Sequence, residues 1–214
     1  MTMKGFLMEE VDQFTKWTTN LQSIAQAGLH YGKDVFDRER YEQVRKIAGE
    51  MMQAKTGLPK EQIKTLFLGD EGYQTPKIET RAAIFKDDKI LLVRERKAQE
   101  WSLPGGWNDY DQTTAQNCVK EAREESGRIV KPVKLIAVQD RNRHNKPVLA
   151  THVTKMFYLC KEISGEFVPN DETDACDYFA LDNLPKLSID RNTKEQIEMC
   201  FKASKDPNWE TVFE

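Results

Sequence analysis

Three glutamates, Glu121, Glu124 and Glu125, stand at helical spacing shortly after the turn Pro104-Gly105-Gly106. At about 100° per residue, their carboxylates share one helical stripe roughly 100° wide. Carboxylates this crowded repel each other unless a cation neutralises them, and all-oxygen ligands suit the hard ions Mg²⁺ and Mn²⁺. The spacing thus describes a divalent-metal site. Taken alone, however, the three glutamates favour an ordinary solvated helix face, because 31% of the chain is charged.

A helix that could hold these acids is indicated by its own start and stop signals. Thr113 followed by Gln116 is typical of a capping box, and Gly127 of the left-handed residue that ends a helix. The expected helix runs from about 114 to 126. An apolar stripe beside the acidic one would dock it on a sheet; its members are Ala115, Cys118, Val119 and Ala122.

The segment that begins at Gly106 resembles a Nudix box. The positions in register are Gly106, Glu121, Ala122, Glu124, Glu125 and Gly127. Three positions differ: Gln112 replaces a glutamate, Lys120 an arginine and Arg128 an apolar residue. The preceding run, Trp101-Ser102-Leu103-Pro104-Gly105-Gly106-Trp107, resembles the lead-in to the box. The resemblance implies an α/β fold, the Nudix αβα sandwich with a mixed sheet.

The same resemblance implies a metal site and an activity. Glu121, Glu124 and Glu125 would bind Mg²⁺ or Mn²⁺ and serve catalysis, with the backbone carbonyl of Gly105 as a further metal ligand. The implied enzyme is a pyrophosphohydrolase that cleaves a nucleoside diphosphate linked to another moiety, of the ADP-ribose or CDP-choline type, into two phosphate monoesters. The weaker point of the site is its supporting pair, Gln112 and Lys120, since lysine lacks the planar fork of arginine.

Further site residues are expected outside the box. Glu172 resembles the acid that related enzymes place before the closing strand, so it is a candidate general base or extra ligand, and a solvated loop acid is an equal alternative. The candidates for substrate binding are Arg81, Arg94, Arg141 and Arg143. Guanidinium groups suit phosphate or ribose, although strand arginines are often surface ion pairs and any one of the others could belong to a plain basic turn.

The first 70 or so residues show helical periodicity. A long helix containing Trp17, Leu21 and Ile24 is expected to stop at Gly28, a second to be capped by Asp37, and a third to begin near Pro59 and stop at Gly69. The segments Gly28–Tyr31 and Phe36–Tyr41 resemble the helical N-terminal domain of one bacterial branch of Nudix hydrolases. Because residues 1–72 lack the basic excess of a DNA-binding bundle, we expect this domain to serve in dimerisation and in covering the active site.

Three parts of the chain follow from these patterns: a helical N-terminal domain at 1–71, a linker at 72–79 and a Nudix domain at 80–214. The expected strands are 80–85, 89–94, 134–141, 151–160 and 176–181, with a last helix at 192–203. A hairpin turn is expected at Lys86-Asp87-Asp88.

Composition narrows the remaining possibilities. No apolar run approaches the roughly 18 residues of a membrane span, and the beginning lacks the apolar stretch of a signal peptide, so a cytoplasmic location without membrane contact is expected. The cysteines are widely spaced, which argues against a zinc site or a disulfide framework; they are Cys118, Cys160, Cys176 and Cys200. A net charge of −3 offers no general attraction to nucleic acid.

Two other classes of function stay open at this point. The replacements at Gln112 and Lys120 allow a nucleotide-sensing binding protein that kept the fold and lost turnover. A helical module could instead belong to a DNA-binding regulator, but residues 1–72 carry more acidic than basic side chains, and a DNA-binding bundle would normally present a basic face. Because the three box glutamates are intact, catalysis on a small-molecule substrate by a homodimer is the favoured hypothesis.

Overall fold

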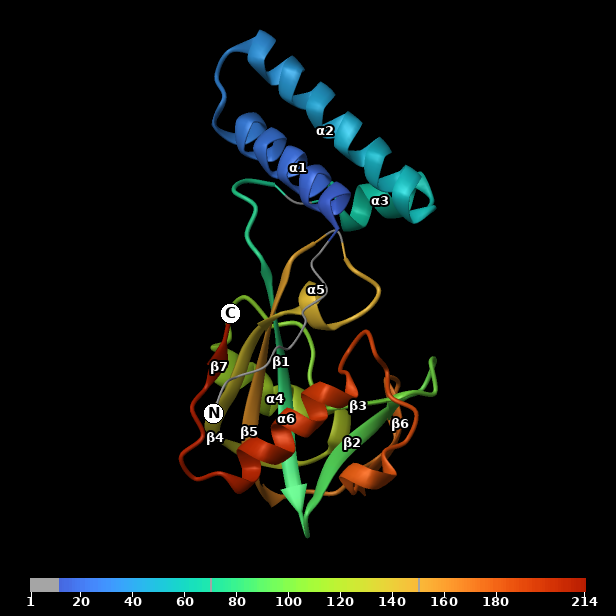
Figure 1. Ribbon diagram of the computed structural model, residues 1–214, viewed down its shortest axis with the longest axis vertical. Helices are drawn as coiled ribbons and strands as arrows, with labels where there is room; N and C mark the ends of the chain where they lie inside the picture. The colour runs from blue at the N-terminus through green and yellow to red at the C-terminus, as the bar shows by residue number, and fades with distance from the viewer. Residues whose placement is uncertain (1–11, 70, 150) are drawn as a thin grey trace, which may run out of the picture. The chain divides into compact units, whose positions relative to one another are not determined.

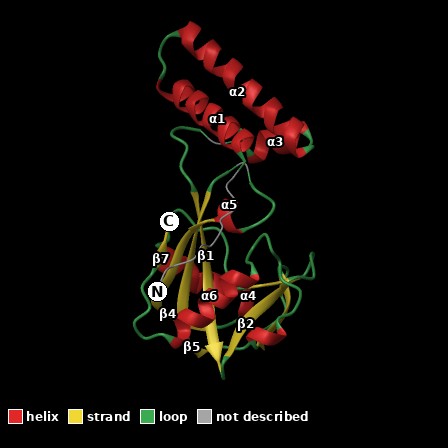
Figure 2. Cartoon of the chain, in the orientation of Figure 1, coloured by secondary structure: helices red, strands yellow, loops and turns green. Residues whose placement is uncertain are grey.

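The computed structural model describes residues 12–69, 71–149 and 151–214. The chain divides into two compact units with the boundary between Pro76 and Lys77, and residues 148–152 group with the first unit. Figures 1 and 2 show helices in the first unit and both helices and strands in the second. Within the described ranges, no helix is both long enough and apolar enough to cross a membrane.

The first unit is built from three helices, α1 (Gln13–Tyr31), α2 (Val35–Thr56) and α3 (Lys60–Leu66). The expectation that Asp37 caps the second helix is wrong. Asp34 is the cap, because its carboxylate accepts hydrogen bonds from the backbone N–H groups of Phe36 and Asp37. Helix α3 begins after Pro59 and ends at Leu66, before the expected stop at Gly69.

Gly28 was expected to end the first helix, and this is also wrong, since α1 continues to Tyr31 and ends at Gly32. A Cβ atom at Gly28 would lie only 2.4 Å from the ring of Tyr41 on α2. Gly28 therefore lets α1 and α2 approach each other closely. Its role is packing, and sequence alone did not distinguish this from a helix stop.

The second unit carries one seven-stranded sheet in the order β3-β2-β1-β5-β4-β7, with β6 also paired to β2. Its pairs are mixed: β1 runs parallel to β5 and antiparallel to β2. The strands are β1 (Lys77–Lys86), β2 (Lys89–Glu95), β3 (Trp101–Ser102), β4 (Ile129–Asp140), β5 (Val153–Ser164), β6 (Thr173–Phe179) and β7 (Val212–Phe213).

Two helices cover opposite faces of this sheet. On one face α6 (Lys194–Lys205) buries Ile197 and Phe201 against Ala83 and Phe157. On the other, α4 (Thr114–Ser126) buries Cys118 and Ala122 against strand residues that include Ala82 and Ile84. The alternation of Ala82, Ala83 and Ile84 between the two cores is the period of a strand buried on both faces. The expected αβα sandwich is confirmed.

Several boundaries differ from those expected. Strand β1 begins at Lys77, so Lys77–Glu79 belong to the sheet and not to a linker. Arg141 was expected to end a strand and instead opens the short helix α5 (Arg141–His144), because Asp140 accepts a hydrogen bond from the backbone N–H of Asn142 and caps a helical turn. The short strands β3 and β7 and the 3₁₀ turn η1 (Leu181–Asn183) were not predicted. All four cysteines are free, and three are buried, as expected of small apolar side chains.

Candidate active site

Helix α4 carries the three glutamates, and its bounds agree with the sequence prediction. The capping box is present: the Thr113 hydroxyl accepts from the N–H of Gln116, and the Gln116 side chain accepts from the N–H of Thr113. Gly127 ends the helix with a φ of 67°, where a Cβ atom would lie 2.0 Å from the carbonyl oxygen of Glu166. Glycine is thus required there. With both ends fixed and one face in the core, the acidic stripe has a defined position.

Glu125 lies against the glycine turn. Its carboxylate accepts a hydrogen bond from the backbone N–H of Gly105 at 2.8 Å, and the residue is only 4% exposed. Burial raises the pKa of Glu125 to about 7, although Arg81 and the Gly105 N–H act in the opposite direction. Gly105 has a φ of 149°, and a Cβ atom would lie 2.0 Å from the carbonyl oxygen of Thr80 on β1. Only glycine lets the turn approach the strand so closely.

Glu121 and Glu124 both form ion pairs with Lys120. The ammonium of Lys120 lies 3.2 Å from a carboxylate oxygen of Glu121 and 3.0 Å from one of Glu124, and it also reaches Asp109 at 3.2 Å. Burial raises the pKa of Glu121, against the effect of Lys120. The carboxylate of Glu121 also packs against Gly106, since a Cβ atom there would lie 2.5 Å from its Oε2.

These pairs explain why the carboxylates do not converge. Among the described residues, no three His, Cys, Asp or Glu side chains are grouped closely enough to hold a metal ion as they stand. Glu121 and Glu124 turn to Lys120, whereas Glu125 turns to Gly105. The structure brings Glu121 and Glu125 against the glycine turn, whereas Glu124 is in contact with Lys120.

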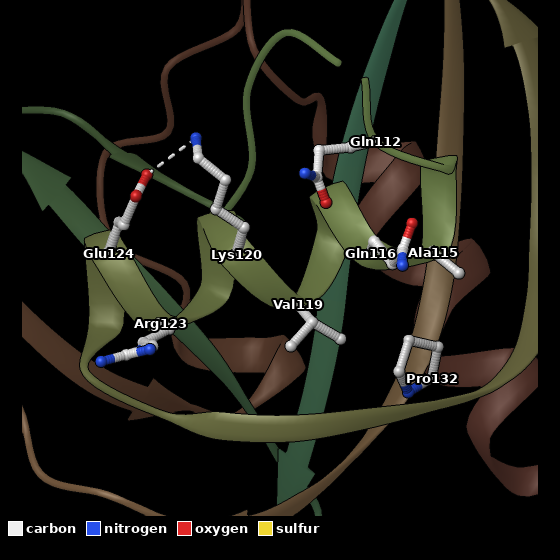
Figure 3. Close-up of a pocket in the computed structure, with 8 residues that line it drawn as sticks. All are labelled: Gln112, Ala115, Gln116, Val119, Lys120, Arg123, Glu124 and Pro132. Atoms are coloured by element: carbon white, nitrogen blue, oxygen red, sulfur yellow. Dashed lines mark ion pairs between the residues drawn. The ribbon is translucent and has the colours of Figure 1, made fainter. Parts of the chain in front are cut away.

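The two supporting positions that differ from the box, Gln112 and Lys120, both line a pocket of about 790 Å³ along α4 (Figure 3). Gln116 and Arg123 add polar groups to its wall, and Glu124 pairs with Lys120 at its edge. The pocket also has an apolar lining of Ala115, Val119 and Pro132. The replaced pair therefore lies at a surface that solvent reaches.

The loop that carries Glu172 is tied to the end of α4. The side chain of Asn170 donates to the carbonyl oxygen of Glu124 at 2.9 Å, and the Thr173 hydroxyl donates to that of Glu125 at 2.7 Å. Glu172 itself is exposed. The structure thus brings this loop beside the box glutamates, and the role of the Glu172 carboxylate stays a prediction.

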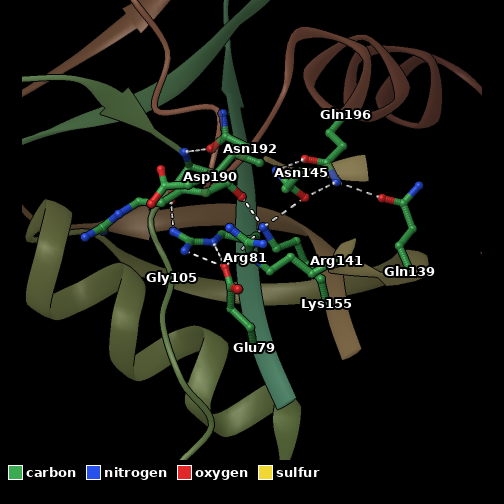
Figure 4. A network of polar contacts seen from close by, with 12 residues as sticks. Glu79, Arg81, Gly105, Gln139, Arg141, Asn145, Lys155, Asp190, Asn192 and Gln196 are labelled. Carbon is green, nitrogen blue, oxygen red and sulfur yellow. Dashed lines mark hydrogen bonds and ion pairs between the residues drawn. The ribbon is translucent and has the colours of Figure 1, made fainter. Parts of the chain in front are cut away.

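The four arginines proposed for substrate binding lie in different surroundings. Arg81 is 4% exposed and donates to the carboxylate of Glu79 at 2.5 Å and to the carbonyl oxygen of Leu103 at 2.9 Å. Arg141 is equally buried, and its guanidinium donates to the carbonyl oxygen of Pro147. Both belong to the network of Figure 4. Their contact with a substrate stays a prediction.

The other two arginines are more accessible. Arg94 pairs with Asp174 at 2.8 Å and lies over the ring of Trp101, which itself packs edge-on against Phe179. Arg143 pairs loosely with Asp140 at 3.8 Å. No contact joins either of them to the box glutamates among the interactions that the structure describes.

The buried network contains residues that the sequence analysis did not single out. Lys155 on β5 is completely buried, and its ammonium lies 3.4 Å from the carboxylate of Glu79, which stands opposite it on β1. Burial lowers the pKa of Lys155 to about 7. A signal for Lys155 existed, because Val153 and Phe157, two residues to either side, face the core. Glu79 was not recognised from the sequence because it was assigned to the linker at 72–79.

Comparison with known proteins extends over both units. Residues 76–200 match the family model described as the NUDIX domain, and residues 12–67 match the model described as "UDP-X-like, N-terminal oligomerisation domain". The chain is 42% identical over 203 residues to the protein named "Putative ADP-ribose pyrophosphatase YjhB" of Bacillus subtilis (strain 168). The aligned residues cover 94% of this chain and 98% of that protein.

Two solved structures are similar as well. A UDP-X diphosphatase has 36% sequence identity and a TM-score of 0.62, with 93% of this chain and 97% of that chain covered. An ADP-ribose pyrophosphatase of Streptococcus suis 89-1591 has 48% identity and a TM-score of 0.61, with 65% of this chain and 100% of that chain covered.

Proposed function

Because the chain belongs to the Nudix family, we propose that it is a divalent-metal-dependent hydrolase of a nucleoside diphosphate linked to another group. The observation that carries the proposal is the contact between the box and the glycine turn. Glu125 accepts from the N–H of Gly105, and Glu121 packs against Gly106. The acids and the turn, distant in sequence, are thus held at one place.

The donor set fits a hard cation. Glu121, Glu124, Glu125 and the carbonyl of Gly105 offer only oxygen atoms, which suits Mg²⁺ or Mn²⁺. The raised pKa of Glu125 means that its anion is costly in this buried place, and a bound cation would remove that cost. When bound, such an ion supplies charge neutralisation for phosphate oxygens and a more acidic water. The ammonium of Lys120 would have to leave Glu121 and Glu124 to make room.

The chain's own residues would supply orientation and proton transfer. The Gly105 N–H fixes the direction of the Glu125 carboxylate. Glu172, on the loop tied to α4, is the candidate that accepts a proton from the attacking water. Water adds across the P–O–P bond, one phosphorus takes the hydroxyl oxygen, and the other phosphate leaves as a second monoester. ADP-ribose would then give AMP and ribose 5-phosphate.

ADP-ribose is the first substrate to consider, because relatives bear the name ADP-ribose pyrophosphatase, and UDP-linked or CDP-choline-type diphosphates come next. A binding protein without turnover is not favoured, since these relatives are named as hydrolases. The test is a panel of such diphosphates incubated with Mg²⁺ or Mn²⁺, with both products identified. If the folded protein hydrolyses none of these diphosphates, the proposal is wrong.

We further propose that the first unit joins two copies of the chain. Three large apolar side chains along one stripe of α1 are exposed: Trp17 at 57%, Ile24 at 59% and Tyr31 at 63%. The face of α1 that is buried includes polar residues instead, namely Thr15, Thr18, Thr19, Gln22 and Gln26. A helix with its apolar stripe outward is typical of one that packs on a partner. The matched model's description as an oligomerisation domain agrees with this and does not favour DNA binding.

The change Trp17→Ser combined with Ile24→Ser should convert the dimer to a monomer, because it removes two apolar side chains from the proposed interface. Light scattering coupled to size-exclusion chromatography measures the mass directly. Lys46→Ser, on an exposed part of α2, is the matched control and should stay dimeric. A wild-type protein that is monomeric at micromolar concentration would contradict this assignment.

A further inference from the structure

The turn Ser188–Asn192, which precedes α6, is fixed from several directions. The Asn192 side chain accepts from the N–H of Leu103 at 2.7 Å, and the Asn145 side chain donates to the carbonyl of Ile189 at 2.9 Å. The ammonium of Lys155 donates to the carbonyl of Arg191. Contacts from three separate segments therefore hold this turn in place, and the contact from Lys155 is to the backbone of Arg191 itself.

The side chain of Arg191 extends from this turn to the box. One of its terminal nitrogens lies 2.9 Å from a carboxylate oxygen of Glu95, and the other lies 3.8 Å from one of Glu125. The second distance is too long for a hydrogen bond, so that nitrogen attracts Glu125 only by charge. Nothing in the sequence near Arg191 indicated this, because Glu95 and Glu125 lie on other elements.

Arg191 differs from Arg81, the other arginine whose charge acts on Glu125. The guanidinium of Arg81 is 4% exposed and is engaged by Glu79 and by the carbonyl of Leu103. The side chain of Arg191 is 29% exposed. A substrate at the box can therefore reach Arg191 without opening the core, whereas reaching Arg81 would break a buried ion pair.

We propose that Arg191 binds the diphosphate of the substrate, presented by the fixed Ser188–Asn192 turn beside Glu125; this inference rests on the function proposed above. A guanidinium matches a phosphate with two parallel N–H···O bonds, which an ammonium cannot do. The nitrogen that makes no hydrogen bond with Glu125 is available for such a contact. The other terminal nitrogen pairs with Glu95, which therefore competes with the phosphate for the guanidinium.

The test compares three variants in binding of the α,β-methylene analogue of ADP-ribose, whose bridging carbon resists hydrolysis, by calorimetry with Mg²⁺ present. Arg191→Met should weaken binding by about tenfold or more, the range expected for loss of a charge-assisted contact. Arg191→Lys should restore part of the affinity. Glu95→Gln removes the competing carboxylate and should bind the analogue at least as tightly as wild type.

Each outcome bears on the assignment. Equal weakening by Arg191→Met and Glu95→Gln, with equal falls in melting temperature, would make the pair structural and overturn the inference. Wild-type affinity in Arg191→Met, with the wild-type enzyme active on the panel, would overturn the inference alone. A wild-type protein that neither binds the analogue nor hydrolyses any diphosphate would remove the proposed function and this inference with it.

Discussion

Glu79 and Glu125 are two buried carboxylates in the same unit, and their surroundings differ. Glu79 lies within 2.5 Å of Arg81 and 3.4 Å of Lys155. Burial raises its pKa, but the two cations outweigh that effect and hold the pKa below its usual value. Glu125 has a single backbone N–H at hydrogen-bond distance and a guanidinium at 3.8 Å, and burial raises its pKa to about 7.

The difference fits a structural role for Glu79 and the proposed role of Glu125 as a metal ligand. Glu79 is compensated by cations that the fold itself provides, so its charge belongs to the architecture of β1 and β5. The charge of Glu125 is less fully compensated, and carboxylates with a strongly raised pKa are found often at functional sites. Each prediction below tests how the two sites differ, although Arg81 acts by charge on both Glu79 and Glu125.

The largest effect is expected from breaking the buried set. Arg81→Met leaves Glu79 with Lys155 alone and should lower the free energy of unfolding by roughly 3–5 kcal/mol, the usual cost of an uncompensated buried charge. Urea denaturation at pH 7 measures it. The double change Arg81→Met with Glu79→Gln removes both charges and should be less destabilising than Arg81→Met alone. Wild-type stability of the single variant would show that Glu79 does not depend on Arg81.

A change at Glu124, the exposed glutamate of the box, should affect activity and not stability. Glu124→Gln removes a proposed metal ligand and should lower kcat/KM for ADP-ribose by about 100-fold or more, because metal binding contributes several kcal/mol to such reactions. Its melting temperature should hold, since the side chain is 56% exposed. Glu198→Gln is the matched control, an exposed helical glutamate that also follows a lysine by four residues. Equal activity in both variants would contradict the assigned role of Glu124.

The two sites should also differ in the pH dependence of stability. The pKa of Lys155 is lower in the folded protein than in the unfolded chain. Between pH 7 and 8.5 the unfolded chain therefore binds more protons than the folded protein. The free energy of unfolding should then rise with pH, by up to about 1.4 kcal/mol per pH unit. The pKa of Glu125 is higher in the folded protein than in the unfolded chain. Between pH 5 and 7 the unfolded chain therefore binds fewer protons than the folded protein, and the free energy of unfolding should fall as pH rises.

Urea denaturation in metal-free buffer at four pH values separates these contributions. Stability of Lys155→Met should rise less above pH 7 than that of wild type, and stability of Glu125→Gln should fall less below pH 7, where Glu121 still contributes a fall. In the wild-type protein, Mg²⁺ should suppress the fall in stability below pH 7 and leave the rise in stability above pH 7 unchanged. The reason is that Glu125 belongs to the proposed metal site and Lys155 does not. Identical slopes in all three proteins would mean that the two sites do not differ in this way.

The smallest effect is expected from the supporting pair. Gln112→Glu together with Lys120→Arg restores the family residues beside the ligands and should tighten Mn²⁺ binding by up to about tenfold. Calorimetric titration with Mn²⁺ measures the change. Weaker binding in the double variant would show that Gln112 and Lys120 are suited to this site as they stand.

The parts of the fold that follow local rules could be predicted from the sequence, and those that depend on distant contacts could not. Helix α4 was predicted with its bounds because Thr113, Gln116 and Gly127 act within a few residues. Gly28 was misinterpreted because its reason lies in Tyr41 on another helix. The same applies to the site: the box was readable, whereas Arg191 reaches Glu95 and Glu125 only through the fold.

The central claim is that the box carboxylates, unlike Glu79, bind a divalent cation from outside the protein. Titration of Mn²⁺ followed by electron paramagnetic resonance tests it directly, with wild type, Glu125→Gln and Glu100→Gln, a glutamate paired with Lys186 away from the box. We expect wild type and Glu100→Gln to bind Mn²⁺ equally and Glu125→Gln to bind it at least about tenfold more weakly. Equal affinity in all three proteins would contradict the claim.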